Sequence, residues 1–387
     1  MSTQRKSIQK EPTSPSGLYI HIPFCRSKCP YCDFYSIAST SLVPQWLEAL
    51  EKEILFYKDK FYSFDTIYFG GGTPSLLDID MIEKILNTLK TEYSFKEDTE
   101  ITLEANPCDM TPVKIEGIKS LGTNRINLGV QSFNDDELHF LGRRHRGSDS
   151  ERVLNDLGKA GFDNIGIDLI YGLKSQTLKA WQKTLEQAID FSPEHISCYQ
   201  LTIEGKTVFN AMKNKGILDN LAEDEAGSFF LKTAGFLEEN GYLHYEVSNY
   251  ARGLKYKSRH NIKYWDRIPY LGLGPSAHSF DGRKRWWNHR SARKYCASLR
   301  DGESPIENFE ILTGEQEILE KLALGLRTAA GLDMDILSIY PESIKKIKEL
   351  ETSGHIRING SKIVPTKKGL LVADQLPLYI IPSQYNS

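Results

Sequence analysis

Short apolar runs alternate with amphipathic stretches over the first two thirds of the chain. The runs predict strands at 18–22, 66–69, 99–103, 125–130, 164–170 and 195–201. The stretches between them predict helices at 44–57, 81–91, 112–120, 150–160 and 177–190. Strands separated by helices indicate βαβ units, and therefore a parallel sheet with right-handed crossovers. We expect an α/β fold with an open sheet or a full or partial barrel.

The pattern changes after residue 250. Residues 251–305 are rich in aromatic residues, His and Arg, and contain the chain breakers Gly272, Gly274 and Pro275. Beyond them the pattern predicts helices at 313–327 and 341–352, a hairpin over 354–366 and a last helix from Lys367. Helices followed by a short hairpin are typical of a winged-helix arrangement. We therefore predict a core over 17–250, a connecting segment over 251–305 and a smaller α+β domain over 306–387.

Composition and charge exclude several classes of protein. The formal net charge of −3 over 387 residues gives no electrostatic reason to expect a nucleic acid or a bilayer as partner. Residues 1–16 are polar, so we predict a disordered leader rather than a signal peptide. No stretch approaches the roughly 18 apolar residues of a membrane span. We expect a cytoplasmic protein.

Three of the six cysteines, Cys25, Cys29 and Cys32, lie close together directly after the first predicted strand. This usage favours a metal site in a reducing compartment over a disulfide scaffold. Thiolates prefer zinc or iron–sulfur centres, and a structural zinc needs four ligands. The nearest fourth candidate is His21, inside an apolar strand. Three ligands leave one iron of a four-iron, four-sulfur (4Fe–4S) cluster open, and that iron can chelate the amino and carboxylate groups of S-adenosylmethionine (SAM).

Polar residues also follow the other predicted strands. The run 70–73 (GGGT) follows the second strand, Glu104 ends the third, Gln131 the fourth, and Asp168 lies at the end of the fifth. Because the C-terminal ends of parallel strands meet at one edge, we expect these groups in one shared mouth. The alternatives are a plain turn for the glycines, a solvated carboxylate for Glu104 and a structural salt bridge for Asp168. Arg143 suits a carboxylate, unless it is a surface residue or Arg144 takes that role.

The spacing of the three cysteines resembles the radical SAM superfamily. A set of motifs, in order, is similar to the oxygen-independent coproporphyrinogen III oxidases and their relatives: YIHIPFC at 19–25, GGGTP at 70–74, LEANP at 103–107, GVQSF at 129–133, LGRRH at 141–145 and IDLIYGL at 167–173. The resemblance covers about residues 17–376 and implies a partial (β/α)6 barrel. By motif it implies SAM contacts at Tyr19, Tyr31, Gly71, Gly72, Thr73, Glu104, Gln131, Arg143 and Asp168. Of these, Tyr31, Gln131, Arg143 and Asp168 resemble contacts of a second SAM.

Two branches of this family differ after the third cysteine. The true oxidases have a fourth cysteine where this chain has Phe34, and they carry a longer N-terminal segment. The sequence CDFYS at 32–36 resembles the heme chaperone branch instead, as does the HNIKYW run at 260–265. In that run the resemblance implies heme contacts at His260, Asn261, Tyr264 and Trp265. Histidine is a common heme ligand, although a lone histidine among aromatics is more often a packing residue. His278 and His289 are alternative axial ligands.

One loop departs from the family pattern. Relatives commonly have YGLPGQT where this chain has YGLKSQT at 171–177. The change removes a rigid turn, and we expect a looser loop beside Asp168.

The resemblance implies a heme chaperone that passes heme to an unknown acceptor protein and carries the cluster and SAM. It also implies an electron donor such as flavodoxin or ferredoxin and admits a homodimer. The alternatives are a coproporphyrinogen III oxidase, which would use a SAM-derived radical, and a zinc-stabilised binding module. We expect no oxidase activity, leave open whether the chain is an enzyme, and assign no catalytic residue.

Overall fold

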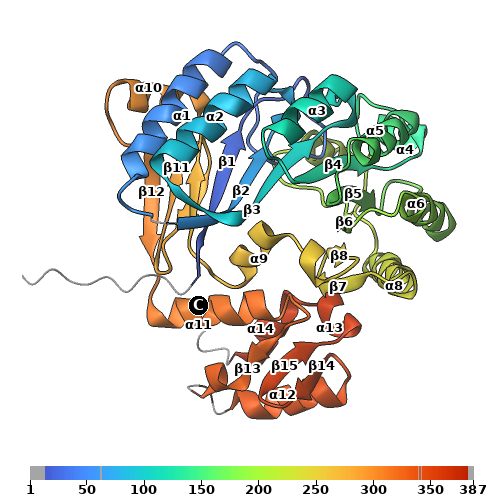
Figure 1. The fold of residues 1–387 in the computed structure, drawn as a ribbon. Coiled ribbons are helices and arrows are strands. Elements are labelled where there is room, and N and C mark those ends of the chain that lie inside the picture. Colours follow the sequence, from blue (N-terminus) through green and yellow to red (C-terminus); the bar gives the residue numbers. More distant parts are fainter. Residues whose placement is uncertain (1–13, 62, 339, 341, 382–387) are drawn as a thin grey trace, which may run out of the picture.

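The computed structural model describes residues 14–61, 63–338, 340 and 342–381. Most of the predicted leader lies outside these residues, and its last residue, Ser16, already begins a strand. Within the described residues a twelve-stranded sheet forms the centre of the larger unit, in the order β12-β11-β10-β9-β1-β2-β3-β4-β5-β6-β8-β7. A three-stranded antiparallel sheet forms the centre of a smaller C-terminal unit (Figure 1).

The six predicted strands form the parallel middle of the large sheet, as expected. They are β1 (Ser16–Ile22), β2 (Ser63–Gly71), β3 (Ser94–Ala105), β4 (Arg125–Gln131), β5 (Ile165–Tyr171) and β6 (His195–Gln200). The main connecting helices are α1 (Val43–Tyr57), α2 (Ile79–Glu92), α3 (Pro112–Ser120), α4 (Asp135–Phe140), α5 (Gly147–Lys159) and α6 (Leu178–Asp190). Two further helices, α7 (Val208–Asn214) and α8 (Glu223–Glu239), follow β6.

Apolar residues that alternate along the strands explain the packing. In β1, the side chains of Leu18, Ile20 and Ile22 are fully buried in the main core, which also contains Trp46 and Leu50 of α1. The residues between them, beginning with Tyr19, point to the other face of the sheet. The sheet is an open arc, because among the described residues its order begins at β12 and ends at β7.

The segment predicted as a connector, 251–305, is largely part of the sheet. It contributes β9 (Tyr270–Leu273), β10 (His278–Phe280) and β11 (Lys284–Asn288), with the helices α9 (Arg259–Trp265) and α10 (Ala292–Arg300). β9 pairs in parallel with β1, opposing Gly272 to Tyr19. β12 (Ile306–Ile311) pairs with β11, so the sheet continues past the predicted boundary at 306. On the other side the sheet ends with β8 (Asn249–Ala251) and β7 (Leu243–Glu246). The division into domains itself stays a prediction.

The C-terminal unit has its own apolar core, which includes Leu322, Ile347, Ile363 and Ile380. Its strands are β13 (Leu332–Asp333), β14 (Ile356–Asn359) and β15 (Lys362–Pro365), and its helices are α11 (Gly314–Gly325), α12 (Ser343–Thr352), α13 (Lys367–Leu371) and α14 (Gln375–Ile380). This arrangement confirms a smaller α+β unit with a β-hairpin. α9 lies between the large sheet and this unit (Figure 1).

Two global expectations from the sequence can be compared with this structure. No helix within the described ranges is both long and apolar enough to cross a bilayer. All six cysteines are free thiols, which agrees with the expectation that the chain is no disulfide scaffold.

Candidate functional site

A cavity of about 400 Å³ opens at the C-terminal ends of the parallel strands. The three clustered cysteines line it, together with most of the polar residues singled out from the sequence: Tyr31, Gly71, Gly72, Thr73, Glu104, Gln131, Arg143 and Asp168. The structure therefore brings together residues that lie more than 140 positions apart, as the strand pattern predicted. Tyr19 is the exception: it is not part of the cavity lining, and its hydroxyl lies 3.1 Å from Nδ1 of His21.

The cysteine loop joins β1 to α1 and is held by backbone hydrogen bonds. The N–H of Cys25 donates to the carbonyl of Ile37 at 3.0 Å, and the N–H of Cys32 donates to the carbonyl of Cys29 at 3.1 Å. The Thr73 hydroxyl donates to Sγ of Cys25 at 3.4 Å, and Nη1 of Arg143 donates to Sγ of Cys29 at 3.7 Å. Burial raises the pKa of the Cys32 thiol.

The donor set suits an iron–sulfur cluster better than a single ion. Among the described residues, no three His, Cys, Asp or Glu side chains are grouped so that they could hold one metal ion. The thiolates of a 4Fe–4S cluster bind separate irons, so they need not converge on one point. Soft thiolates at one wall of a cavity fit such a cluster and leave room beside its fourth iron. Cys25, Cys29 and Cys32 would hold it.

The glycine run after β2 brings two loops into close contact. Gly71 has a φ of +110°, and a side chain on Gly72 would place a Cβ 2.6 Å from the carbonyl oxygen of Phe24. The N–H of Gly72 donates to Ile22 at 2.7 Å, and that of Thr73 donates to Phe24 at 2.8 Å. These N–H groups are therefore not free for a ligand, and the glycines serve to dock this loop on the cysteine loop.

Glu104 holds its carboxylate inside the cavity at the end of β3. The Tyr68 hydroxyl donates a hydrogen bond to Oε1 of Glu104 at 2.8 Å. Burial raises the pKa of Glu104 to about 7, and the nearby Asp168 adds to this effect. A carboxylate so poorly solvated gains from a cationic partner, which favours the amino group of a ligand over water.

Gln131 and Arg143 also line the cavity. Gln131 ends β4 with a φ of 66° at a shift in the strand register, an uncommon conformation for a residue with a side chain. Nη2 of Arg143 donates to the carbonyl of Gly129 at 2.9 Å, which leaves Nη1 directed at Cys29. A strained residue beside an anchored guanidinium is typical of a ligand site.

The cavity lining also includes polar residues that were not predicted from the sequence, among them Arg125, Asn127 and His195. Oδ2 of Asp168 accepts a hydrogen bond from Nδ2 of Asn127 at 2.7 Å, and burial raises the pKa of Asp168. Arg125 and His195 line the same cavity, and each residue is only 1% exposed. A signal was available in β4, where Arg125, Asn127 and Gly129 alternate with the apolar residues that enter the core.

The four residues predicted for heme all lie on or at the end of α9, but only Asn261 lines the cavity. His260 is 1% exposed, and both ring nitrogens have partners: Nδ1 lies 2.8 Å from the Thr66 hydroxyl and Nε2 lies 2.8 Å from the Tyr264 hydroxyl. An iron ligand needs one free ring nitrogen, which His260 does not offer here. Trp265 contacts Arg327 instead, whose guanidinium lies 5.5 Å from the ring centroid.

The two alternative histidines differ from His260. His278 is exposed at the start of β10, and its ring stacks on Trp287 with centroids 5.6 Å apart. Among the described residues, neither ring nitrogen of His278 has a hydrogen-bond partner. Partial desolvation of the ring and the nearby Arg285 lower the pKa of His278. His289 faces Glu307, with Nδ1 3.7 Å from the carboxylate.

The chain is similar to known proteins in both sequence and fold. The family model for the radical SAM superfamily matches residues 19–188. Two curated proteins named heme chaperone HemW are similar: one from Synechocystis at 37% identity over 82% of this chain and 79% of its own, and one from Bacillus subtilis at 33% over 92% and 97%. The structure is also similar to that of the coproporphyrinogen III oxidase HemN from Escherichia coli, with a TM-score of 0.82, 24% identity, and coverage of 95% of this chain and 90% of that one. At this identity the likeness concerns the fold alone.

Proposed function

Because the chain belongs to the HemW family of heme chaperones within the radical SAM superfamily, we propose that it binds heme and delivers it to an acceptor protein. Support for heme binding comes from these relatives, which are named heme chaperones. For the acceptor we propose only a protein that requires heme. A homodimer and a reductant such as flavodoxin or ferredoxin belong to the same proposal.

The observation that carries the cofactor proposal is the convergence of three thiols and a raised-pKa carboxylate in one cavity. Cys25, Cys29 and Cys32 would hold a 4Fe–4S cluster, and the rest of the cavity lining would bind SAM. When both are bound, the cluster can supply an electron to the sulfonium group of SAM. Glu104 binds the amino group of SAM, while Arg143 and Asp168 contact other polar groups of the same molecule.

For heme, the exposed imidazole of His278 is the ligand that this structure supports better than His260. Its ring nitrogens are unpaired among the described residues, and Trp287 fixes the plane of the ring. It lies on a strand of the same sheet as the cavity, two strands from β1. Heme bound there would be open to solvent on one side, which suits release to an acceptor.

The test combines two measurements on one anaerobically reconstituted sample. We expect iron and sulfide at about four each per chain, and a Soret band on heme addition that survives gel filtration. His278→Ala should lose or shift the Soret band, whereas His139→Ala, a change at another exposed histidine, should not. A colourless, zinc-loaded protein overturns the cluster. Conversion of coproporphyrinogen III by the same sample with SAM and reductant would overturn the chaperone function in favour of an oxidase.

A further inference from the structure

The ring of His260 packs against Tyr68, and Tyr68 hydrogen-bonds to the Glu104 carboxylate. Its ring stacks on Tyr68, with centroids 5.0 Å apart and an interplanar angle of 29°, and the Tyr68 hydroxyl donates to Glu104. We propose that His260 is a positioning residue that fixes Tyr68, and through it the Glu104 carboxylate, for the amino group of SAM. This inference rests on the SAM site proposed above.

The His260 ring has little freedom to move. Its two nitrogens are hydrogen-bonded to Thr66 and Tyr264, and the ring of Tyr19 also stacks on it, with centroids 6.3 Å apart. A side chain at Gly17 would meet the ring at 3.2 Å, so glycine is needed there for the close approach of β1. Desolvation by burial lowers the pKa of His260 to about 3. The ring is therefore neutral, and it acts on Tyr68 by contact rather than by charge.

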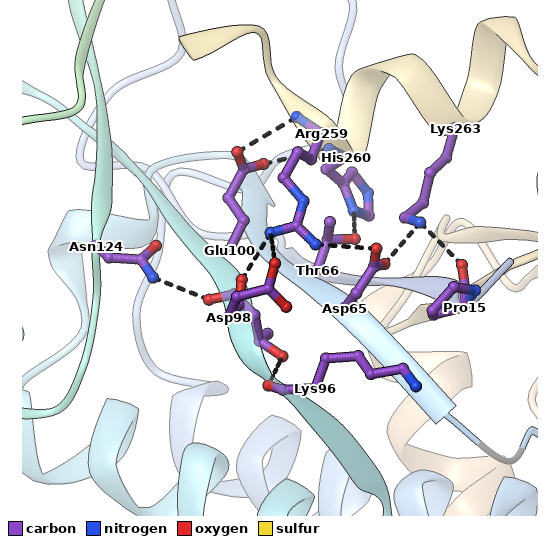
Figure 2. A network of polar contacts seen from close by, with 11 residues as sticks. Pro15, Asp65, Thr66, Lys96, Asp98, Glu100, Asn124, Arg259, His260 and Lys263 are labelled. Carbon is purple, nitrogen blue, oxygen red and sulfur yellow. Dashed lines mark hydrogen bonds and ion pairs between the residues drawn. The ribbon is translucent and has the colours of Figure 1, made fainter. Parts of the chain in front are cut away.

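The helix that carries His260 is anchored on the strands by a polar network (Figure 2). Glu100 accepts hydrogen bonds from the backbone N–H groups of Arg259 and His260, at 3.3 and 3.2 Å. Asp65 pairs with Arg259 at 3.1 Å and with Lys263 at 2.6 Å. An acidic side chain that pairs with two cations of one helix restricts the orientation of that helix on the strands. The network therefore sets where the imidazole meets Tyr68.

The same helix also contacts the C-terminal unit. Just beyond α9, Nε of Arg267 pairs with Glu320 of α11 at 2.6 Å, and Arg327 lies over Trp265. His260 thus faces the SAM cavity through Tyr68, while the residues at the other end of α9 face the C-terminal unit. This bridging position gives the HNIKYW run a structural role between the cavity and the C-terminal unit.

The readout is the pH dependence of SAM binding. Loss of the Tyr68 hydrogen bond would stabilise the protonated form of Glu104, so its pKa would rise and the affinity for SAM would begin to fall at a higher pH. We expect His260→Ala to weaken SAM binding at pH 7 about fivefold to tenfold and to move the midpoint of the profile up by about one pH unit. Tyr68→Phe should do the same, and the double variant should add little, because both changes remove one interaction.

The experiment is SAM binding by equilibrium dialysis to the reconstituted full chain between pH 5.5 and 8.5. Thr66→Val, which removes only the hydrogen bond to Nδ1, gives a milder version should His260→Ala fold poorly, and it should shift the midpoint in the same direction. His244→Ala is the matched control, a buried histidine stacked on Tyr250 at 4.3 Å outside the cavity lining. Unshifted midpoints in His260→Ala and Thr66→Val, or full additivity with Tyr68→Phe, would overturn the inference. A wild-type chain that binds no SAM would instead overturn the proposed SAM site, and the inference with it.

Discussion

The Thr73 hydroxyl donates a hydrogen bond to Sγ of Cys25 over 3.4 Å, which links the glycine loop to a cluster ligand. A donor to a ligand sulfur stabilises the reduced, more negative state of an iron–sulfur cluster. We expect Thr73→Val to lower the midpoint potential of the reconstituted cluster by roughly 40 mV, since one hydrogen bond is worth about 1 kcal/mol and 59 mV corresponds to a tenfold change. A redox titration followed by electron paramagnetic resonance measures it. Thr91→Val on the surface of α2 is the control, and equal potentials in both variants would contradict the prediction.

Gly72 lies in close contact with the backbone at the start of the cysteine loop. Its substitution by alanine would place a Cβ 2.6 Å from the Phe24 carbonyl oxygen and 2.9 Å from that of Ile22, both backbone atoms that cannot turn away. We expect Gly72→Ala to cost about 1–3 kcal/mol and to lower the iron retained after reconstitution. Urea unfolding and iron analysis check both. Gly158→Ala on α5, where no atom lies within 4 Å of the added carbon, should instead stabilise by up to about 1 kcal/mol.

The loop that departs from the family pattern places Ser175 at a φ of 62°. Glycine adopts this conformation without the steric cost that a side chain adds. We expect Ser175→Gly to raise the free energy of unfolding by about 0.5–1 kcal/mol, after allowance for the greater freedom of glycine in the unfolded chain. Ser353→Gly, at a φ of −78°, should not stabilise. A urea midpoint that falls in Ser175→Gly would show that the loop is unstrained.

Glu53 is a buried carboxyl that ties α1 to the antiparallel part of the sheet. It accepts hydrogen bonds from the Gly274 N–H at 2.8 Å, Asn288 Nδ2 at 2.6 Å and the Tyr295 hydroxyl at 2.6 Å. Burial raises its pKa to about 7, so the folded state keeps a proton that the unfolded state has released. The stability that this proton contributes is full below the unfolded pKa and is lost as pH rises to about 7.

We therefore expect the wild type to lose stability relative to Glu53→Gln between about pH 5 and 7, by at most about 1.4 kcal/mol per pH unit. Urea unfolding of both proteins at pH 5, 6, 7 and 8 gives the difference, which should level off above pH 7. A constant difference over this range would mean that Glu53 stays ionised in the folded state.

Much of the site was predictable because the arrangement of parallel strands fixes where the loops after them lie. The cysteine loop, Glu104 and Gln131 each come at or after the end of a strand with a clear apolar pattern, and the C-terminal ends of such strands share one edge of the sheet. Asp168 was expected at the end of its strand, but it lies in the middle of β5 and reaches the cavity from there. The strands β9–β12 were missed because they are only three to six residues long, and β11 and β12 also mix aromatic with charged residues.

The role of His260 shows what sequence could not supply. The family resemblance implied a heme ligand, and the sequence places Thr66 almost two hundred positions away from His260. Only the fold shows that Thr66 and Tyr264 use both ring nitrogens. By contrast, His278 sits in a weakly patterned segment, and its accessibility follows from a strand that the pattern did not reveal.

The two margins of the large sheet are protected from adding further strands in different ways. At β7, the segment after α11 supplies backbone hydrogen bonds, from Val247 to Arg327 and from Ala329 to Tyr245. At β12, the outer strand is exposed and carries Glu307 and Glu310. Like charges on an exposed edge strand disfavour pairing with the edge strand of a second molecule. This matters for a sheet that does not close into a barrel. We therefore expect that replacing Glu307 and Glu310 by neutral residues would cause aggregation at high protein concentration before any loss of folding.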